Sequence, residues 1–152
     1  MLTELETTHD ALRHFLKALV YRFNLIAEDA PADFAEFSAG GEVRRPGDIV
    51  RHMTGLMRFA HGEFGELEQE ILEPLPWPAE CARFTAQVAA FDRVLAADKT
   101  TGSGRGLTLE QVWQGPLIDA MTHIGQLATL RRLAGSPITG GRYWQVELPP
   151  FE

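Results

Sequence analysis

The chain has 152 residues, of which 45% are apolar and 23% charged, so we expect one domain, residues 1–152, with a core that needs no disulfide or structural metal. No apolar run approaches the roughly 20 residues of a bilayer span, which argues against a membrane protein. The net charge is −7 with scattered basic residues, which argues against a nucleic-acid partner. The N-terminal residues lack a signal-peptide pattern and Cys81 is the single cysteine, so a cytoplasmic protein is expected.

The first predicted helix starts near Leu5 and ends before residues 29–31, where Asp-Ala-Pro interrupts it. Seven residues repeat along it at spacings of three and four, which is typical of a helix packed in a bundle. These are Leu5, His9, Leu12, Leu16, Leu19, Phe23 and Ile26. The segment from Pro31 to Pro46 is predicted to be a connection with one short helical turn around Phe34 and Phe37.

The second predicted helix starts between Pro46 and Asp48 and ends before Pro74. Its inward face is expected to carry Ile49, His52, Met53, Leu56, Phe59, Ala60 and Leu67. The Pro-rich residues 74–78 are predicted to be non-helical. A third helix of about twenty residues follows from the spacing of Phe84, Val88, Phe91 and Leu95, and residues 99–106 are predicted to form a flexible loop.

The fourth predicted helix opens with a capping box, Thr108 and Gln111, and stops at Gly135. Pro116 is expected either to kink this helix or to divide it into 108–114 and 116–134. The residues from 140 to 152 are predicted to be an extended tail whose large side chains pack across a bundle end; these are Tyr143, Trp144, Val146 and Leu148. The sequence therefore predicts an all-α protein, an antiparallel bundle of four long helices with a short extended C-terminal tail.

The histidines are informative because a neutral imidazole in a core needs a hydrogen-bond partner or a metal. His52 lies inside the apolar arc of the second helix and is expected to point into the bundle. The ordinary explanation is a core histidine bonded to a carbonyl or to Asp48. His14 lies about 200° from the seam residue Leu12, and His61 lies about 180° from His52, so both are expected to be solvent-exposed and without a role.

On the last helix, Asp119, His123 and Gln126 form a polar stripe beside an apolar face. If this helix neighbours the second one, His52, Asp119 and His123 converge. Two imidazoles and one carboxylate suit Zn²⁺, Ni²⁺, Fe²⁺ or Mn²⁺, with positions left for water or substrate. The alternative is an intrahelical pair of Asp119 with His123 at the rim of the bundle, and the residues alone favour neither.

Three other positions carry side chains capable of chemistry: His9, the pair Arg131 and Arg132, and Cys81. His9 is a candidate fourth ligand or supporting group, although a satisfied core histidine is the better interpretation. The pair Arg131 and Arg132 suits a substrate carboxylate, but cations in the last turn of a helix are expected from the helix dipole alone. Cys81 lies near the start of the third predicted helix, and a thiolate nucleophile is not indicated.

Two stretches resemble the DinB/YfiT-like superfamily: 48–59, which reads DIVRHMTGLMRF, and 119–137, which reads DAMTHIGQLATLRRLAGSP. The most specific piece is the His-x-Gly-Gln run ahead of the Leu-Arg-Arg-Leu-Ala-Gly ending. The resemblance covers nearly the whole chain, including the Tyr-Trp pair of the tail. It implies a four-helix bundle that forms a homodimer, with a divalent metal held by one histidine of the second helix and a His-x-x-x-His pair of the last long helix. Some members are thiol S-transferases that use bacillithiol, mycothiol or glutathione, and many have no known activity.

By position, His52 matches the ligand of the second helix and His123 the second histidine of the pair, while Asp119 stands where the first is expected. A carboxylate ligates the same metals but leaves a weaker Lewis acid. The expected function is a divalent-metal-dependent enzyme, S-transferase-like or hydrolase-like, acting on a small electrophile. The alternatives are a non-catalytic dimeric bundle that binds a small ligand or partner after losing metal function, and a purely structural His52.

Overall fold

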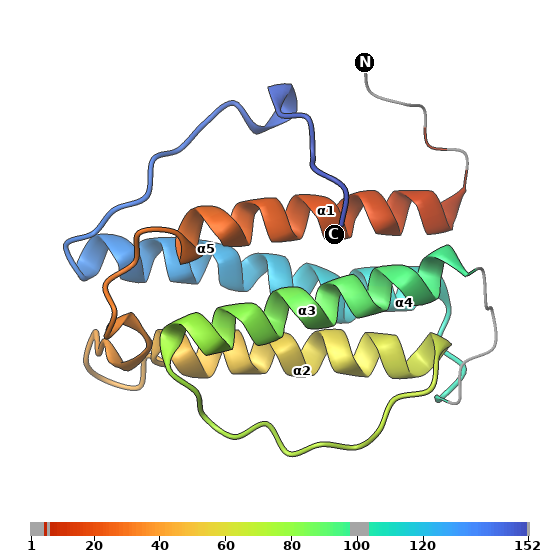
Figure 1. The fold of residues 1–152 in the computed structure, drawn as a ribbon, viewed down its shortest axis with the longest axis horizontal. Helices are drawn as coiled ribbons and strands as arrows, with labels where there is room; N and C mark the ends of the chain where they lie inside the picture. The colour runs from red at the N-terminus through yellow and green to blue at the C-terminus, as the bar shows by residue number, and fades with distance from the viewer. Residues whose placement is uncertain (1–4, 6, 98–103, 152) are drawn as a thin grey trace.

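The computed structural model describes residues 5, 7–97 and 104–151, and these residues contain helices and no strands (Figure 1). The all-α prediction is therefore confirmed for the described part of the chain. The long helices are α1 (Thr8–Ala27), α2 (Pro46–Phe64), α3 (Trp77–Ala96) and α5 (Ile118–Leu133). Between α3 and α5 lie the short α4 (Leu109–Val112) and the π-helical turn η2 (Trp113–Leu117), and two 3-10 turns, η1 (Phe34–Glu36) and η3 (Tyr143–Gln145), complete the set.

The long helices form a ring in which α1 and α2 each contact both α3 and α5. Figure 1 shows α1 and α5 running in one direction and α2 and α3 in the other. The contacts of α2 with α3 agree, because Arg51 lies near Glu80 at one end of these helices and Gly65 lies near Val94 at the other. Each long helix thus has one parallel and one antiparallel neighbour, so the predicted antiparallel order is not confirmed for every pair.

The parallel placement of α2 and α3 depends on the long connection between them. The 19 residues of α2 span about 28 Å, and the extended segment 65–76 reaches up to about 40 Å. The connection therefore returns the chain to the end where α2 began (Figure 1). In the described residues, no helix has the combination of length and apolar composition needed to cross a bilayer.

The core is formed by the apolar faces of the four long helices. On α1, five of the seven predicted seam residues are buried, Leu12, Leu16, Leu19, Phe23 and Ile26. Leu5 lies before the helix and is 47% exposed, and His9 is only partly buried. Phe23 packs against Phe84 of α3 with ring centroids 4.5 Å apart, and Trp77 meets Phe34 of η1 at 4.8 Å. Three expectations were wrong. Phe59 is 37% exposed rather than inward, and Leu67 lies beyond the end of α2. Trp77 and Pro78 belong to the first turn of α3, where proline is tolerated.

The predicted start and stop of the last helical segment are confirmed. The hydroxyl of Thr108 accepts from the backbone N–H of Gln111, and the side chain of Gln111 accepts from the N–H of Thr108. Pro116 has no backbone N–H to donate, and it lies in η2, a wider π-helical turn between α4 and α5. Gly135 ends the segment with φ of 76°, a left-handed conformation that glycine adopts without strain.

The C-terminal tail packs differently from the prediction. Tyr143 lies under the guanidinium of Arg22 at 3.9 Å and meets the ring of Tyr21 at 6.4 Å, so the tail contacts the side of α1 and not an end of the bundle. Trp144 is 76% exposed. Most of the predicted loop 99–106 lies outside the described residues, and only 104–106 can be placed.

Candidate metal centre

The packing of α2 against α5 brings together the three residues that the sequence singled out. His52 comes from the second turn of α2, and Asp119 and His123 come from the first two turns of α5. The Nε2 atoms of His52 and His123 each lie 3.5 Å from a different carboxylate oxygen of Asp119. The two imidazole rings are 4.9 Å apart, nearly perpendicular, and one ligand atom of each residue lies within 4.8 Å of those of the other two. The predicted convergence is confirmed.

These separations are longer than those of hydrogen bonds and are compatible with a shared cation. The two distances of 3.5 Å exceed the range of about 2.7 to 3.2 Å for an N–H···O hydrogen bond. In a tetrahedral site with bonds of about 2.1 Å, neighbouring ligand atoms are about 3.4 Å apart. The two distances from Asp119 to the histidines are close to that spacing, and the three ligand atoms all lie within 4.8 Å of one another.

The Nε2 atom of His123 is a second observation that is compatible with a cation at this site. This atom is buried and has no hydrogen-bond partner among the described residues, an unfavourable state for a polar atom. The other ring nitrogen, Nδ1, lies 2.7 Å from the amide oxygen Oε1 of Gln126. In a neutral ring, an Nδ1–H that donates to this oxygen leaves on Nε2 the lone pair that a cation beside Asp119 would need.

The group lies on the wall of an open cavity of about 690 Å³ between the start of α2, the α5 helix and the segment that follows η1. Its residues are Ala39, Glu42, Val43, Arg44, Ile49, His52, Asp119, His123, Gln126, Thr129, Leu130 and Leu133. His123 is buried, while the side chains of His52 and Asp119 remain 38% and 46% exposed toward solvent. A small molecule therefore has access to the side chains of His52 and Asp119.

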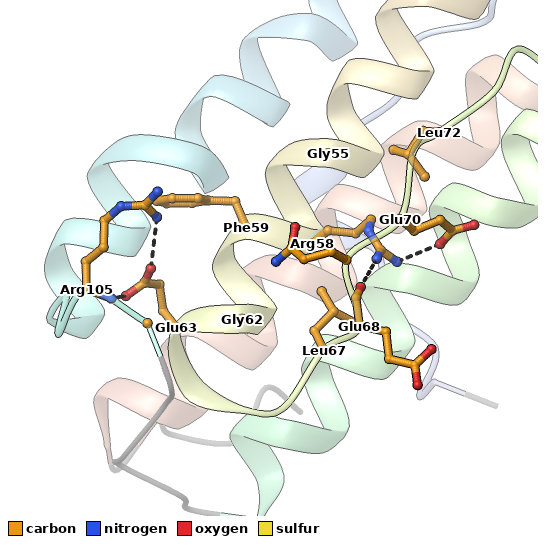
Figure 2. Close-up of a pocket in the computed structure, with 12 residues that line it drawn as sticks. Gly55, Arg58, Phe59, Gly62, Glu63, Leu67, Glu68, Glu70, Leu72 and Arg105 are labelled. Carbon is orange, nitrogen blue, oxygen red and sulfur yellow. Dashed lines mark hydrogen bonds and ion pairs between the residues drawn. The ribbon is translucent and has the colours of Figure 1, made fainter.

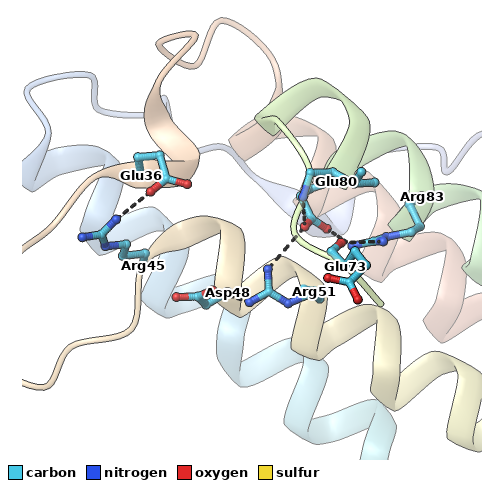
Figure 3. Close-up of polar contacts among 8 residues, drawn as sticks. Glu36, Arg45, Asp48, Arg51, Glu73, Glu80 and Arg83 are labelled. Carbon is cyan, nitrogen blue, oxygen red and sulfur yellow. Dashed lines mark hydrogen bonds and ion pairs between the residues drawn. The ribbon is translucent and has the colours of Figure 1, made fainter. Parts of the chain in front are cut away.

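The helix that carries His52 is anchored by a neighbouring polar cluster (Figure 3). Arg51 pairs with Asp48 on the same helix and reaches the fully buried carboxylate of Glu80 on α3 at 3.6 Å. Glu80 also accepts from Arg83 at 2.6 Å and from the backbone N–H of Leu75 at 3.0 Å. The sequence analysis missed this role of Glu80, because an acid in the first turn of a helix is expected from the dipole alone.

The other described histidines do not belong to the group of His52, Asp119 and His123. Asp48 pairs with Arg51, so a bond from Asp48 to His52 is not what holds this histidine. The expectation that His61 is exposed was wrong: it is only 8% exposed, and its Nδ1 lies 3.1 Å from the amide of Gln87. Burial, reinforced by nearby cationic arginines, lowers the pKa of His61 below its ordinary value. His9 is not a member of the group either.

Arg131 has a structural role that the sequence did not predict. Its guanidinium donates to the backbone carbonyls of Ile26, Glu28 and Asp29, at and just beyond the end of α1, and to Ser136 after α5. The side chain therefore joins the ends of the two helices, which the dipole interpretation did not capture. Burial also raises the pKa of the Cys81 thiol to about 12, in agreement with the expectation that it is not a thiolate nucleophile.

A second cavity, of about 600 Å³, lies further along α2 (Figure 2). Both of its arginines and two of its carboxylates are engaged in contacts within the lining. The carboxylate of Glu63 accepts from the backbone N–H of Arg105 at 2.8 Å, and Arg58 lies 3.0 Å from Glu70 and donates to the carbonyl of Glu68. Its lining includes none of His52, Asp119 and His123, so the cavity beside His52 is the stronger candidate site.

Comparisons with protein-family models, with curated proteins and with solved structures found no match to this chain. The resemblance to the DinB/YfiT-like superfamily therefore stays a prediction from the sequence.

Proposed function

We propose that the protein is a divalent-metal-dependent enzyme of the DinB/YfiT-like type that acts on a small electrophile by thiol transfer or hydrolysis. The observation that carries this proposal is the convergence of His52, Asp119 and His123 on the wall of an open cavity, with the Nε2 atom of His123 buried and unpartnered. A buried lone pair next to a carboxylate is costly unless a cation is bound there.

In this proposal, His52, Asp119 and His123 hold the ion, which would be Zn²⁺, Ni²⁺, Fe²⁺ or Mn²⁺. When bound, it supplies Lewis acidity that lowers the pKa of a thiol or a water at the open positions. The protein groups have separate tasks. Asp119 balances part of the positive charge, Gln126 holds the ring of His123 in the tautomer that leaves Nε2 unprotonated, and the apolar wall around Leu130 limits water at the site.

Metal binding by purified protein tests the proposal. The protein is treated with a chelator, exchanged into metal-free buffer without oxygen and titrated with each of the four ions. We expect one ion per chain in the wild type and a loss of binding in His52→Ala and His123→Ala. His14→Ala is the matched control, since His14 lies on α1 outside the group, and it should bind like the wild type. A wild type without stoichiometric metal contradicts the proposal.

The alternative is a non-catalytic bundle that binds a small ligand or a partner and has lost its metal function. The presence of Asp119 where the resembled family has histidine favours it. If metal function has been lost, Asp119→His raises metal affinity sharply; if the site is built around the carboxylate, this change brings no gain. The proposed homodimer is tested on the same samples by sedimentation, with a single species of twice the chain mass as the expected result.

A further inference from the structure

Arg44 is a cation beside the candidate metal centre that pairs with none of the residues that the structure describes. It lies in the segment just before α2 and lines the large cavity together with His52. It also lines a smaller adjoining hollow with Asp48, Arg51 and His52. Its guanidinium is exposed and makes no hydrogen bond, ion pair or ring contact with any described residue. Its five donors are therefore free to bind a ligand in the cavity.

The next residue, Arg45, shows that an arginine in this segment has an acid within reach. Arg45 pairs with Glu36 of η1 at 2.6 Å and does not line the cavity (Figure 3). Glu42, which lines the same cavity as Arg44, is not bonded to it. Among the described residues, Arg44 therefore differs from Arg45 both in lining the cavity and in making no ion pair.

The cavity wall near Arg44 is apolar and partly exposed. Val43 is 53% exposed and Leu133 is 61% exposed, and both line the cavity along with Ile49 and Leu130. Large apolar side chains at the mouth of a cavity gain free energy when a ligand covers them, at roughly 25 cal/mol for each Å² removed from water. A ligand that fits this wall has an apolar body.

The charges that face the cavity also favour an anion once the centre is loaded. The carboxylates on its lining are Glu42 and Asp119, and the guanidinium is Arg44. A divalent ion held by Asp119 leaves that pair with a net positive charge, so the positive groups outweigh Glu42. An anionic group on the ligand is then attracted toward Arg44, which presents a planar set of donors suited to a carboxylate.

We infer that the cavity takes an apolar carboxylic acid, whose carboxylate accepts hydrogen bonds from Arg44 while its apolar body covers Val43 and Leu133. Arg44 is a specificity-determining residue in this inference. The inference rests on the proposed function only in placing the reactive part of the ligand toward His52, Asp119 and His123. Binding of the carboxylate itself needs no reaction and is measured separately.

The test uses two probes of nearly equal shape, 4-phenylbutyrate and the neutral 4-phenylbutan-1-ol, titrated calorimetrically into zinc-loaded and metal-free protein. We expect the wild type to bind the carboxylate more tightly than the alcohol. Arg44→Gln should weaken carboxylate binding by about tenfold or more, because a charge-assisted bidentate contact is lost, and should leave binding of the alcohol unchanged. Arg45→Gln is the matched control and should bind both probes like the wild type.

Several outcomes overturn the inference. One is an Arg44→Gln variant that binds the carboxylate as the wild type does, which happens if the acid binds the zinc alone. Another is an Arg44→Gln variant that loses affinity for the carboxylate and the alcohol equally. A third is an Arg45→Gln variant that loses as much affinity for the carboxylate as Arg44→Gln does, which indicates a general effect of charge. Failure of the proposed function looks different: the protein binds no zinc, yet the metal-free protein still discriminates between the probes through Arg44.

Discussion

The Nδ1 atom of His123 lies 2.7 Å from the Oε1 atom of Gln126, which follows it by one turn of α5. This contact fixes the orientation of the imidazole and leaves the Nε2 atom facing the carboxylate of Asp119 at 3.5 Å. The polar stripe of α5 therefore combines the two proposed ligands of this helix with a residue that contacts one of them. Residues that hold a metal-binding histidine in this way contribute to affinity although they do not touch the ion.

The first prediction concerns Gln126. Gln126→Leu removes the acceptor for Nδ1, so the ring is free to rotate or to change tautomer, and we expect metal affinity to fall by about tenfold to a hundredfold. Gln126→Glu keeps an acceptor at the same position and should retain the affinity of the wild type or exceed it. Competition with a chromophoric chelator measures both. Equal affinities for Gln126→Leu and the wild type are the result that contradicts the prediction.

The second prediction compares two carboxylates of similar chemistry but different burial (Figure 3). Glu80→Ala leaves Arg51 and Arg83 without their buried acceptor, and we expect it to lower the free energy of unfolding by about 2 kcal/mol. Glu36→Ala removes the exposed partner of Arg45 and should cost less than about 0.5 kcal/mol. Urea unfolding followed by circular dichroism gives both values, and similar losses for the two variants count against the role of Glu80.

The third prediction compares Arg131 with its neighbour. Arg131→Ala leaves the backbone carbonyls near the end of α1 without their donors, so we expect a loss of about 3 kcal/mol in the free energy of unfolding. Arg132 is exposed and its side chain reaches only the carbonyl of Ala128 on its own helix, so Arg132→Ala should cost under about 0.5 kcal/mol. If Arg131→Ala lowers the free energy of unfolding no more than Arg132→Ala does, Arg131 does not stabilise the junction of α1 and α5.

The fourth prediction concerns pH. Burial, and then the charges of Arg58 and Arg93, lower the pKa of His61 in the folded protein below its ordinary value of 6.5. The unfolded chain therefore binds the proton more readily, so the contribution of neutral His61 to stability is present above that value and is lost as the pH falls through the folded pKa. Between about pH 7.5 and about pH 5.5, we expect the free energy of unfolding to decrease less in His61→Gln than in the wild type. An identical decrease in both proteins means that His61 does not contribute.

The fifth prediction concerns Cys81, whose pKa is raised to about 12 by burial and by the charge of Glu80. Since the thiolate is the reactive form, alkylation by iodoacetamide at about pH 8 should be at least about a hundredfold slower in the native protein than in urea. Mass spectrometry of timed samples measures the two rates. Comparable rates in the folded and unfolded states overturn this prediction.

Much of the local structure followed from residue patterns. The seam of α1 from Leu12 to Ile26, the capping box of Thr108 with Gln111 and the stop at Gly135 all depend on residues close together in the chain, and each was predicted correctly. Helical periodicity also placed His52 toward a neighbouring helix. The same method failed for His61, because the angle around one helix does not tell how far its neighbours wrap around it; the amide of Gln87 on α3 covers that side.

The sequence by itself determined that helices form, where most of them begin and end, and that His52, Asp119 and His123 are the residues worth testing together. Only the tertiary structure decided that α2 meets α5, that α2 and α3 run in the same direction, and that Arg44 is left unpaired at the cavity while Arg45 finds Glu36. The physical reason is that hydrogen bonds and apolar spacing within a helix act over a few residues. The choice of neighbours depends instead on how all the apolar faces and connections of the chain pack at once.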